Sequence, residues 1–348
     1  MPKVALAGTL FSDAVRKADN KEDDRGRKRT ANLIYLPVMD KLTLKAWILL
    51  FRPWSYTATL VPFLVGAALA SATHGYLRWW IGLASGLFFQ ATVNLLNTWG
   101  DERSGVDNVP GAIRTTPQVH DGLVSMRTLL AAALLCAASA ALLGLTLCLY
   151  REGGDVWRVC TPLLAVGFLG FLGSTNYSTG IKFKYRGLGV PFVAFLMGPL
   201  EIFAVICILQ PAAALRFLTP QTALLTLPIA SLVCVIMHGN DMRDIPTDRA
   251  AGIRTTASAL GPKGALILYW LCHLLPYLIC ALMIGRYGRF FLLPFMSLPL
   301  TRRTLTAATR TYLDCPENPP WRRLERASGG IHFIFGALYA LALSLAYS

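Results

Sequence analysis

Apolar stretches of about twenty residues follow one another along most of this chain and are separated by short polar segments. They lie near residues 52–71, 78–98, 127–149, 158–176, 188–209, 221–241, 264–285, 288–300 and 329–347. A helix needs about 20 residues to cross the hydrocarbon core of a bilayer. The pattern therefore predicts an all-α, polytopic membrane helical bundle with about nine transmembrane helices. The eighth stretch is short and contains Pro294 and Pro299, and without it the count is eight.

The segment before the first apolar stretch differs in character. Residues 1–43 are polar and carry a dense run of charges between Lys21 and Arg29. A segment with so little apolar surface cannot bury enough of it to fold. We therefore expect a disordered, cytoplasmic N-terminal tail, followed by one membrane domain over residues 44–348.

Composition and charge narrow the class of protein. Only 15% of the 348 residues are charged and 54% are hydrophobic, whereas soluble domains carry about 25% charged residues. The net charge of +14 lies in the tail and between the apolar stretches rather than on one face, which argues against a nucleic-acid partner. Anionic membrane lipid and a diphosphate substrate are the expected partners.

The loop charges also predict an orientation in the membrane. With nine spans and a cytoplasmic N-terminus, most of the lysines and arginines between spans fall on the cytoplasmic side, as the positive-inside rule requires. The organelle stays open between the endoplasmic reticulum or Golgi, the mitochondrion and a bacterial inner membrane.

Oxygen-bearing side chains gather at the end of the second stretch. Asn97 and Asp101 are four residues apart, a spacing that places both on one face of a helix. Asp107 follows Gly105, so it can lie past the helix end and fold back toward the same face. This segment predicts a short column of oxygen ligands.

A second column occurs at the end of the sixth stretch, where Asn240, Asp244 and Asp248 repeat the spacing of four. Acidic groups beside membrane spans are costly without compensation, and like charges at this spacing repel. One such segment is typical of an ordinary interfacial loop, but two on the same face favour a metal site. Mg²⁺ prefers oxygen ligands and commonly bridges carboxylates to phosphate oxygens, so we expect Mg²⁺ as the cofactor.

Basic residues close to both columns are the expected contacts of a diphosphate group, through charge-assisted hydrogen bonds. They are Arg103, Arg114, Lys184, Arg243 and Arg249. An apolar cavity among the helices would then hold the hydrocarbon tail of the same substrate.

These residues resemble the motifs of the UbiA superfamily of membrane prenyltransferases. Its first pattern, NxxxDxxxxxD, is matched by Asn97, Asp101 and Asp107, and its second, DxxxD, by Asp244 and Asp248. The resemblance covers roughly residues 48–347. Within the superfamily the chain is most similar to the MenA-type 1,4-dihydroxy-2-naphthoate prenyltransferases and the vertebrate menaquinone-4 synthases, through segments 52–55, 94–107, 180–185 and 248–255.

The resemblance implies a Mg²⁺-dependent transfer of a prenyl group from an isoprenoid diphosphate to an aromatic or quinone precursor, here a naphthoquinone of menaquinone (vitamin K2) biosynthesis. Asp101, Asp107, Asp244 and Asp248, with Asn97, would hold the metal. Metal and basic residues then stabilise the departing diphosphate, and the bundle excludes water from the allylic cation. By the same resemblance, Asp101 and Asp244 are catalytic, Lys184 contacts phosphate, and Tyr177 contacts the cation or phosphate; Asn97 and Asn240 assist in diphosphate binding.

Three positions depart from the pattern. The MenA-type proteins have Gly-Leu-Gly-Asp where this chain has Val190 at the fourth position, so one carboxylate near the reaction centre is missing. Pro246 falls inside the second column, where it kinks the helix or begins a new one. Asp241 is an additional carboxylate with no expected role.

Two further residues concern the acceptor. Glu201 lies within the fifth stretch, where a carboxylate is a functional candidate; it would orient or deprotonate the acceptor, or simply pair with a buried polar group. Arg52 is the second candidate acceptor contact. For His238 we expect a structural hydrogen bond rather than catalysis.

Other functions fit the sequence less well. The acceptor could be 4-hydroxybenzoate, homogentisate or haem instead of a naphthoquinone. A CDP-alcohol-type phosphotransferase also uses clustered aspartates, but its single motif is absent. A transporter would place its polar site near the membrane midplane, whereas these carboxylates lie at span ends. An inactive, regulatory relative is the remaining alternative, given Val190.

Overall fold

The computed structural model describes residues 41–71, 75–105, 119, 121–149 and 156–347. Within these ranges the chain is helical, and its single β-type contact is an isolated bridge between Arg186 and Arg254. The predicted all-α fold is confirmed. Residues 1–40 of the predicted tail, together with Asp107 and Arg114, lie outside the described residues, whereas the last three residues assigned to the tail, 41–43, begin a helix.

The helices follow the apolar stretches closely. The first half contains α2 (Lys41–Leu50), η1 (Pro53–Ser55), α3 (Thr57–Leu69), α4 (Tyr76–Ser104), α6 (Met126–Leu149), α7 (Val156–Tyr177) and η3 (Phe183–Tyr185). The second half contains α8 (Gly189–Phe195), η4 (Leu196–Leu200), α9 (Glu201–Leu209), η5 (Ala214–Phe217), α10 (Pro220–Arg243), α11 (Ile245–Ala250), α12 (Thr256–Tyr287), η6 (Arg289–Ser297), α13 (Leu298–Asp314) and α14 (Leu324–Tyr347).

Six of the described helices are long and apolar enough to cross a membrane, and a bent pair that includes α3 makes a seventh. The chain is therefore an integral, multi-pass membrane protein, but the count of nine spans is not confirmed. The segment predicted as the eighth span forms the 3₁₀ helix η6, with Pro294 inside it. It leads into α13, whose Arg302 and Arg303 are exposed.

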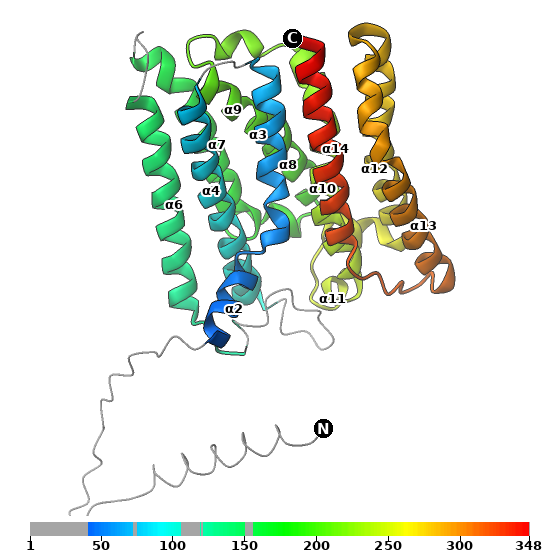
Figure 1. Ribbon diagram of the computed structural model, residues 1–348. Helices are drawn as coiled ribbons and strands as arrows, with labels where there is room; N and C mark the ends of the chain where they lie inside the picture. Colours follow the sequence, from blue (N-terminus) through cyan, green and yellow to red (C-terminus); the bar gives the residue numbers. More distant parts are fainter. Residues whose placement is uncertain (1–40, 72–74, 106–118, 120, 150–155, 348) are drawn as a thin grey trace, which may run out of the picture. The chain divides into compact units, whose positions relative to one another are not determined.

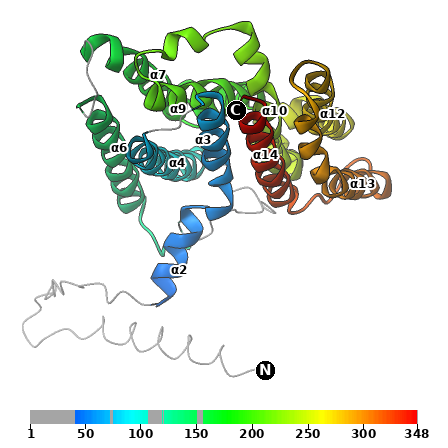
Figure 2. The same ribbon diagram turned by 45° about the horizontal axis from the view of Figure 1, so that its top comes forward.

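Helix α10 lies at the centre of the membrane domain, because most of its apolar segment is covered by other helices. Helices α12 and α14 pack against it, and α14 also packs along α3, while α4 packs against α6 (Figures 1 and 2). Close approaches depend on glycine: a Cβ on Gly198 would lie 2.8 Å from Cα of Ala230 in α10.

One helical segment is interrupted where the site is built. Helix α10 ends at Arg243, Asp244 follows as its cap, and α11 begins with Pro246 in its first turn. Pro246 thus starts a new helix, which settles the alternative that the sequence left open. The backbone hydrogen bonds from Asp244 to Asn240 and from Asp248 to Asp244 continue across the junction, at 3.0 and 2.8 Å.

Two loops join at the same end of the bundle. The Arg186–Arg254 bridge pairs the loop before α8 with the loop before α12, and Thr256 Oγ1 donates to the carbonyl of Gly187 at 3.0 Å. Helix α11 and the C-terminal end of α4 lie at this end in Figure 1. Segments far apart in sequence therefore meet beside the two aspartate columns.

Candidate active site

A cavity of about 440 Å³ lies among α3, α4, α6, α7, α9 and α10. At one end its lining is polar, with Arg52, Asn94, Asn97, Tyr177 and Asn240. The rest is mostly apolar or small, and continues along α4 as far as Gly82. From Asn97 to Gly82 the helix rises by roughly 22 Å at about 1.5 Å per residue, so the cavity is long enough for an extended chain.

Asp101 lies near the C-terminal end of α4, one helical turn beyond Asn97 at the polar end of the cavity. Lys184 Nζ donates to both of its carboxylate oxygens, at 2.9 and 3.0 Å, and the hydroxyl of Tyr185 donates to Oδ1 at 2.6 Å. The side chains of Lys184 and Asp101 are only 17% and 16% exposed. The structure therefore joins the first motif to the loop after α7 through a nearly buried ion pair.

Electrostatics maintain this pairing. Burial lowers the pKa of Lys184, but the Asp101 carboxylate outweighs it and the pKa ends well above the usual value. Burial together with the same carboxylate raises the pKa of Tyr185. Lys184 is therefore a permanent cation and Tyr185 a permanent hydrogen-bond donor. The sequence placed Tyr185 in a family segment but indicated no role for it.

Arg243 holds the carboxylate of the second motif. Its Nε and Nη2 donate to the two carboxylate oxygens of Asp244 at 2.7 and 2.6 Å, and Nη1 donates to Oδ1 of Asn240 at 3.2 Å. On its other side, Nη1 lies 3.8 Å from a carboxylate oxygen of Glu325 in α14. The arginine predicted to contact diphosphate is thus already engaged by two carboxylates, and no sequence pattern indicated Glu325.

Asp248 is buried in α11 and accepts a hydrogen bond from Thr255 Oγ1 at 2.8 Å. Its pKa is raised to about 6, chiefly by burial; Asp244 and Asp101 contribute to the rise, and the Thr255 hydrogen bond and Lys184 oppose it. Because Asp101 of the first motif affects the pKa of Asp248 in the second, the two motifs lie within electrostatic range of each other. Arg249, one residue on, is exposed.

The donor set of both motifs suits Mg²⁺, because it consists of carboxylate and amide oxygens. In the described part of the chain, no three acidic, histidine or cysteine side chains are close enough to bind one ion by themselves. Mg²⁺ usually binds one or two carboxylates and takes its other ligands from water and phosphate. The residues therefore fit a metal that arrives with a diphosphate.

The remaining polar groups lie at the cavity end. Asn97 Oδ1 accepts a hydrogen bond from Ser178 at 3.1 Å. Arg52 adopts a left-handed backbone conformation (φ 51°) and donates to Thr98 Oγ1 at 3.0 Å. The hydroxyl of Tyr177 is buried and has no hydrogen-bond partner among the described residues. An orphaned hydroxyl that borders the cavity is available to a ligand.

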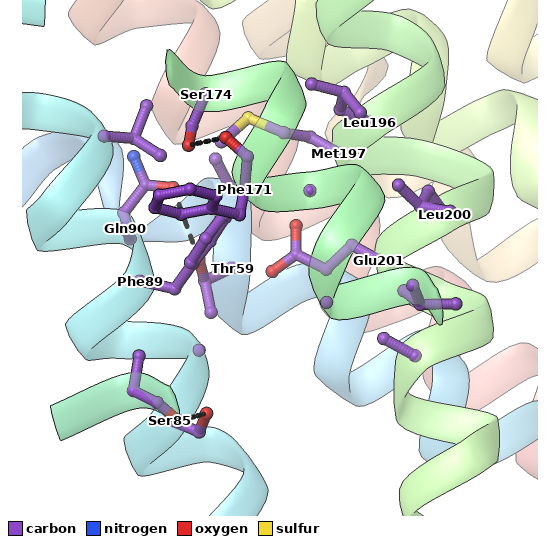
Figure 3. Close-up of a pocket in the computed structure, with 18 of the residues that line it drawn as sticks. Thr59, Ser85, Phe89, Gln90, Phe171, Ser174, Leu196, Met197, Leu200 and Glu201 are labelled. Carbon is purple, nitrogen blue, oxygen red and sulfur yellow. Dashed lines mark hydrogen bonds between the residues drawn. The ribbon is translucent and has the colours of Figure 1, made fainter. Parts of the chain in front are cut away.

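Glu201 lies deeper in the cavity wall (Figure 3). Thr59 is the hydrogen-bonding neighbour of its carboxyl group, and the hydroxyl hydrogen of Thr59 is directed to Oε1 of Gln90 at 3.4 Å. Gln90 precedes Asn97 by seven residues, which is roughly 10 Å along α4. The structure thus separates this acceptor candidate from the polar end, where Arg52 lies.

The two remaining departures from the family pattern, Val190 and Asp241, now have positions, and so does His238. Val190 is buried in an apolar cluster with Met242 and Ile245, and does not line the cavity. Asp241 is 3% exposed and lies within electrostatic range of Lys184 and both motifs. The imidazole of His238 contacts the carbonyl of Ala265 at 2.9 Å, which is the structural hydrogen bond that we expected.

Comparisons with known proteins give a family match and several relatives. A model of the UbiA prenyltransferase family matches residues 59–345. The chain is 31% identical to the UbiA prenyltransferase domain-containing protein 1 of Xenopus tropicalis over 90% of each chain, and 29% identical to the human protein of that name over 89% of this chain and 88% of the other.

Solved structures share the fold at lower identity. A UbiA homolog from Archaeoglobus fulgidus bound to GPP and Mg²⁺ has a TM-score of 0.59 and 17% identity, over 86% of this chain and 99% of that one. The apo UbiA homolog from Aeropyrum pernix K1 has a TM-score of 0.58 and 17% identity, over 81% of this chain and 96% of the other.

Proposed function

Because the chain belongs to the UbiA prenyltransferase family, it is a membrane prenyltransferase with an isoprenoid substrate, and we propose that it prenylates a naphthoquinone precursor in menaquinone (vitamin K2) biosynthesis. The proposal rests on the position of two ion pairs next to the cavity. Asp101 with Lys184, and Asp244 with Arg243, lie beside the polar end of a long apolar cavity. Such an arrangement suits a substrate with a charged head and a hydrocarbon tail.

The cavity length supports a donor of up to four isoprene units. With C–C bonds of about 1.5 Å, the four main-chain bonds of one extended unit span roughly 5 Å. Four units then need roughly 20 Å, close to the roughly 22 Å between the levels of Asn97 and Gly82 along α4. A tail with its first carbon at Asn97 would end near Gly82.

The diphosphate would lie at the motifs, on the cytoplasmic side that the loop charges predict. Lys184 would bind phosphate oxygens there, with Arg249 and Asn240 in support. Asp101, Asp244 and Asp248 would hold Mg²⁺, which supplies positive charge against the developing charge of the leaving group. The Archaeoglobus fulgidus homolog was solved with GPP and Mg²⁺ bound, which supports the same donor class for this chain.

At the first carbon of the tail, the carbon–oxygen bond breaks and its electron pair leaves with the diphosphate. A ring carbon of the acceptor donates an electron pair to the resulting allylic cation, and the ring then loses the proton from that carbon. The buried hydroxyl of Tyr177 borders this position, and its lone pairs would stabilise the cation. The apolar walls exclude water, which would otherwise capture the cation.

The test is prenyl transfer in membranes that contain the folded chain. Labelled geranylgeranyl diphosphate is supplied with dihydroxynaphthoate, menadiol, 4-hydroxybenzoate or homogentisate, with Mg²⁺ or with a chelator. We expect a Mg²⁺-dependent product with a naphthoquinol acceptor, and none from Asp244→Asn, which keeps the size of the side chain but loses its charge. Product with 4-hydroxybenzoate alone would refute the menaquinone assignment, and wild-type activity of Asp244→Asn would refute the site.

A further inference from the structure

Glu201 introduces the one carboxyl group of this part of the cavity, whose lining is apolar apart from the hydroxyl and amide groups of Thr59, Ser85, Gln90 and Ser174. Around it the lining includes Phe89, Phe171, Leu196 and Leu200 (Figure 3). Arg52 is the single basic residue among the described lining residues, and it lies at the polar end. Glu201 therefore faces the cavity with Thr59 as its hydrogen-bonding neighbour and without a cation beside it.

The position of this carboxyl group along the cavity divides the tail in two. Through Thr59 it is level with Gln90, roughly 10 Å from Asn97 along α4. Two isoprene units of roughly 5 Å each, measured from Asn97, end at that level. The third and fourth units have to pass it and enter the section that Gly82 and Ile208 line.

The distance also argues against contact with the reacting ring carbon. That carbon must approach the first carbon of the tail, at the polar end, whereas Glu201 lies about two isoprene units deeper. A general base has to be within hydrogen-bond reach of the proton it removes. Glu201 is therefore placed to act on the tail rather than on the ring proton.

The hydration of this carboxyl group would differ between a bound long tail and a bound short tail. In a cavity that holds a short tail, water can occupy the deeper section and hydrogen-bond to the free oxygen of Glu201. A long tail displaces that water and leaves one oxygen against hydrocarbon. Burying a polar group without a partner weakens binding by roughly tenfold or more.

We propose that Glu201 determines the chain-length preference of the enzyme, by disfavouring isoprenoid diphosphates whose third and fourth units must cover its carboxyl group. The inference rests on the proposed prenyl transfer and defines its donor. The cavity is long enough for four isoprene units. Glu201 reduces the gain in binding that the apolar contacts of the third and fourth units would otherwise give.

The experiment compares kcat/KM for geranyl and geranylgeranyl diphosphate, with two and four isoprene units, at a saturating concentration of one acceptor. Glu201→Leu removes the polar group, and we expect the geranylgeranyl-to-geranyl ratio to rise by roughly tenfold. Glu201→Gln keeps a polar group of the same size and should keep the wild-type ratio. Leu200→Met, a volume-conserving change of the neighbouring lining residue, controls for altered packing.

The outcomes separate the two proposals. A Glu201→Leu protein that turns over geranyl diphosphate with an unchanged ratio would overturn the chain-length role, and so would the same increase in Leu200→Met. A separate titration of the acceptor that gave a higher acceptor KM with both donors would assign Glu201 to the acceptor instead. If Glu201→Leu does not fold, the test rests on Glu201→Gln. A geranylgeranyl-to-geranyl ratio for Glu201→Gln that is measurably below the wild-type ratio would also contradict the inference. Absence of product from the folded wild-type chain with every donor would refute prenyl transfer itself.

Discussion

Lys184 allows the link between the first motif and the diphosphate to be tested by one substitution. Lys184→Met keeps most of the side-chain length and removes both of its hydrogen bonds to Asp101. Asp101 then keeps the Tyr185 hydroxyl as its donor, at 2.6 Å. Because the pair is mostly buried, loss of a hydrogen bond to a charged group should cost about 1.5–3 kcal/mol of folding free energy.

The effect on catalysis should exceed the effect on stability. Removal of one donor that faces the charge of a leaving group typically lowers kcat by about a hundred- to a thousandfold. The assay measures initial rates with labelled donor in detergent-solubilised protein, beside a thermal unfolding curve.

Lys182 provides a matched control for this loop. It is exposed, lies 5.9 Å from the ring centre of Tyr185, and adopts a left-handed conformation (φ 59°). Asparagine tolerates that conformation, so Lys182→Asn removes a charge without straining the loop, and we expect less than about a twofold change in rate. If Lys184→Met kept the wild-type rate, or if Lys182→Asn lost as much, the assignment of Lys184 to the departing diphosphate would be refuted.

Two further predictions concern groups outside the motifs. Glu325→Gln removes the charge that faces Arg243 on the side opposite Asp244, so we expect a several-fold lower kcat and a higher Mg²⁺ requirement; an unchanged Mg²⁺ titration would contradict this. Gly198→Ala places a Cβ against the backbone of Ala230 and should cost about 1–3 kcal/mol, seen as a lower unfolding temperature. Gly285→Ala meets no atom within 4 Å and should leave that temperature unchanged or slightly higher.

The fold follows largely from the apolar stretches, because a segment that cannot expose its backbone to lipid must form a helix. The stretches near 78–98 and 127–149 correspond to α4 and α6 within a few residues. The prediction was weakest at 288–300, where hydrophobicity alone does not distinguish a span from a 3₁₀ helix with Pro294 inside it.

The site was predictable only as far as local spacing extends. Asn97 and Asp101 share a helix face, as their separation of four residues requires. The pairing of Asp101 with Lys184, 83 residues away, depends on how α7 returns toward α4, and no local pattern contains that. Arg243 turns toward Glu325 because α14 approaches α10 closely at Gly239, which is likewise a tertiary effect.

The short turn between α8 and α9, Leu196–Leu200, is π-helical, and this affects how the span can change in length. A π turn winds more residues into one turn than an α-helix does. Deleting one residue there would let the turn become α-helical while both flanking helices keep their faces. The same deletion within α9 would rotate everything after it by roughly 100°, and Ala204 and Ile208 would leave the cavity wall. The turn is thus the position at which evolution or an engineer can shorten this span and still leave Glu201 facing the substrate.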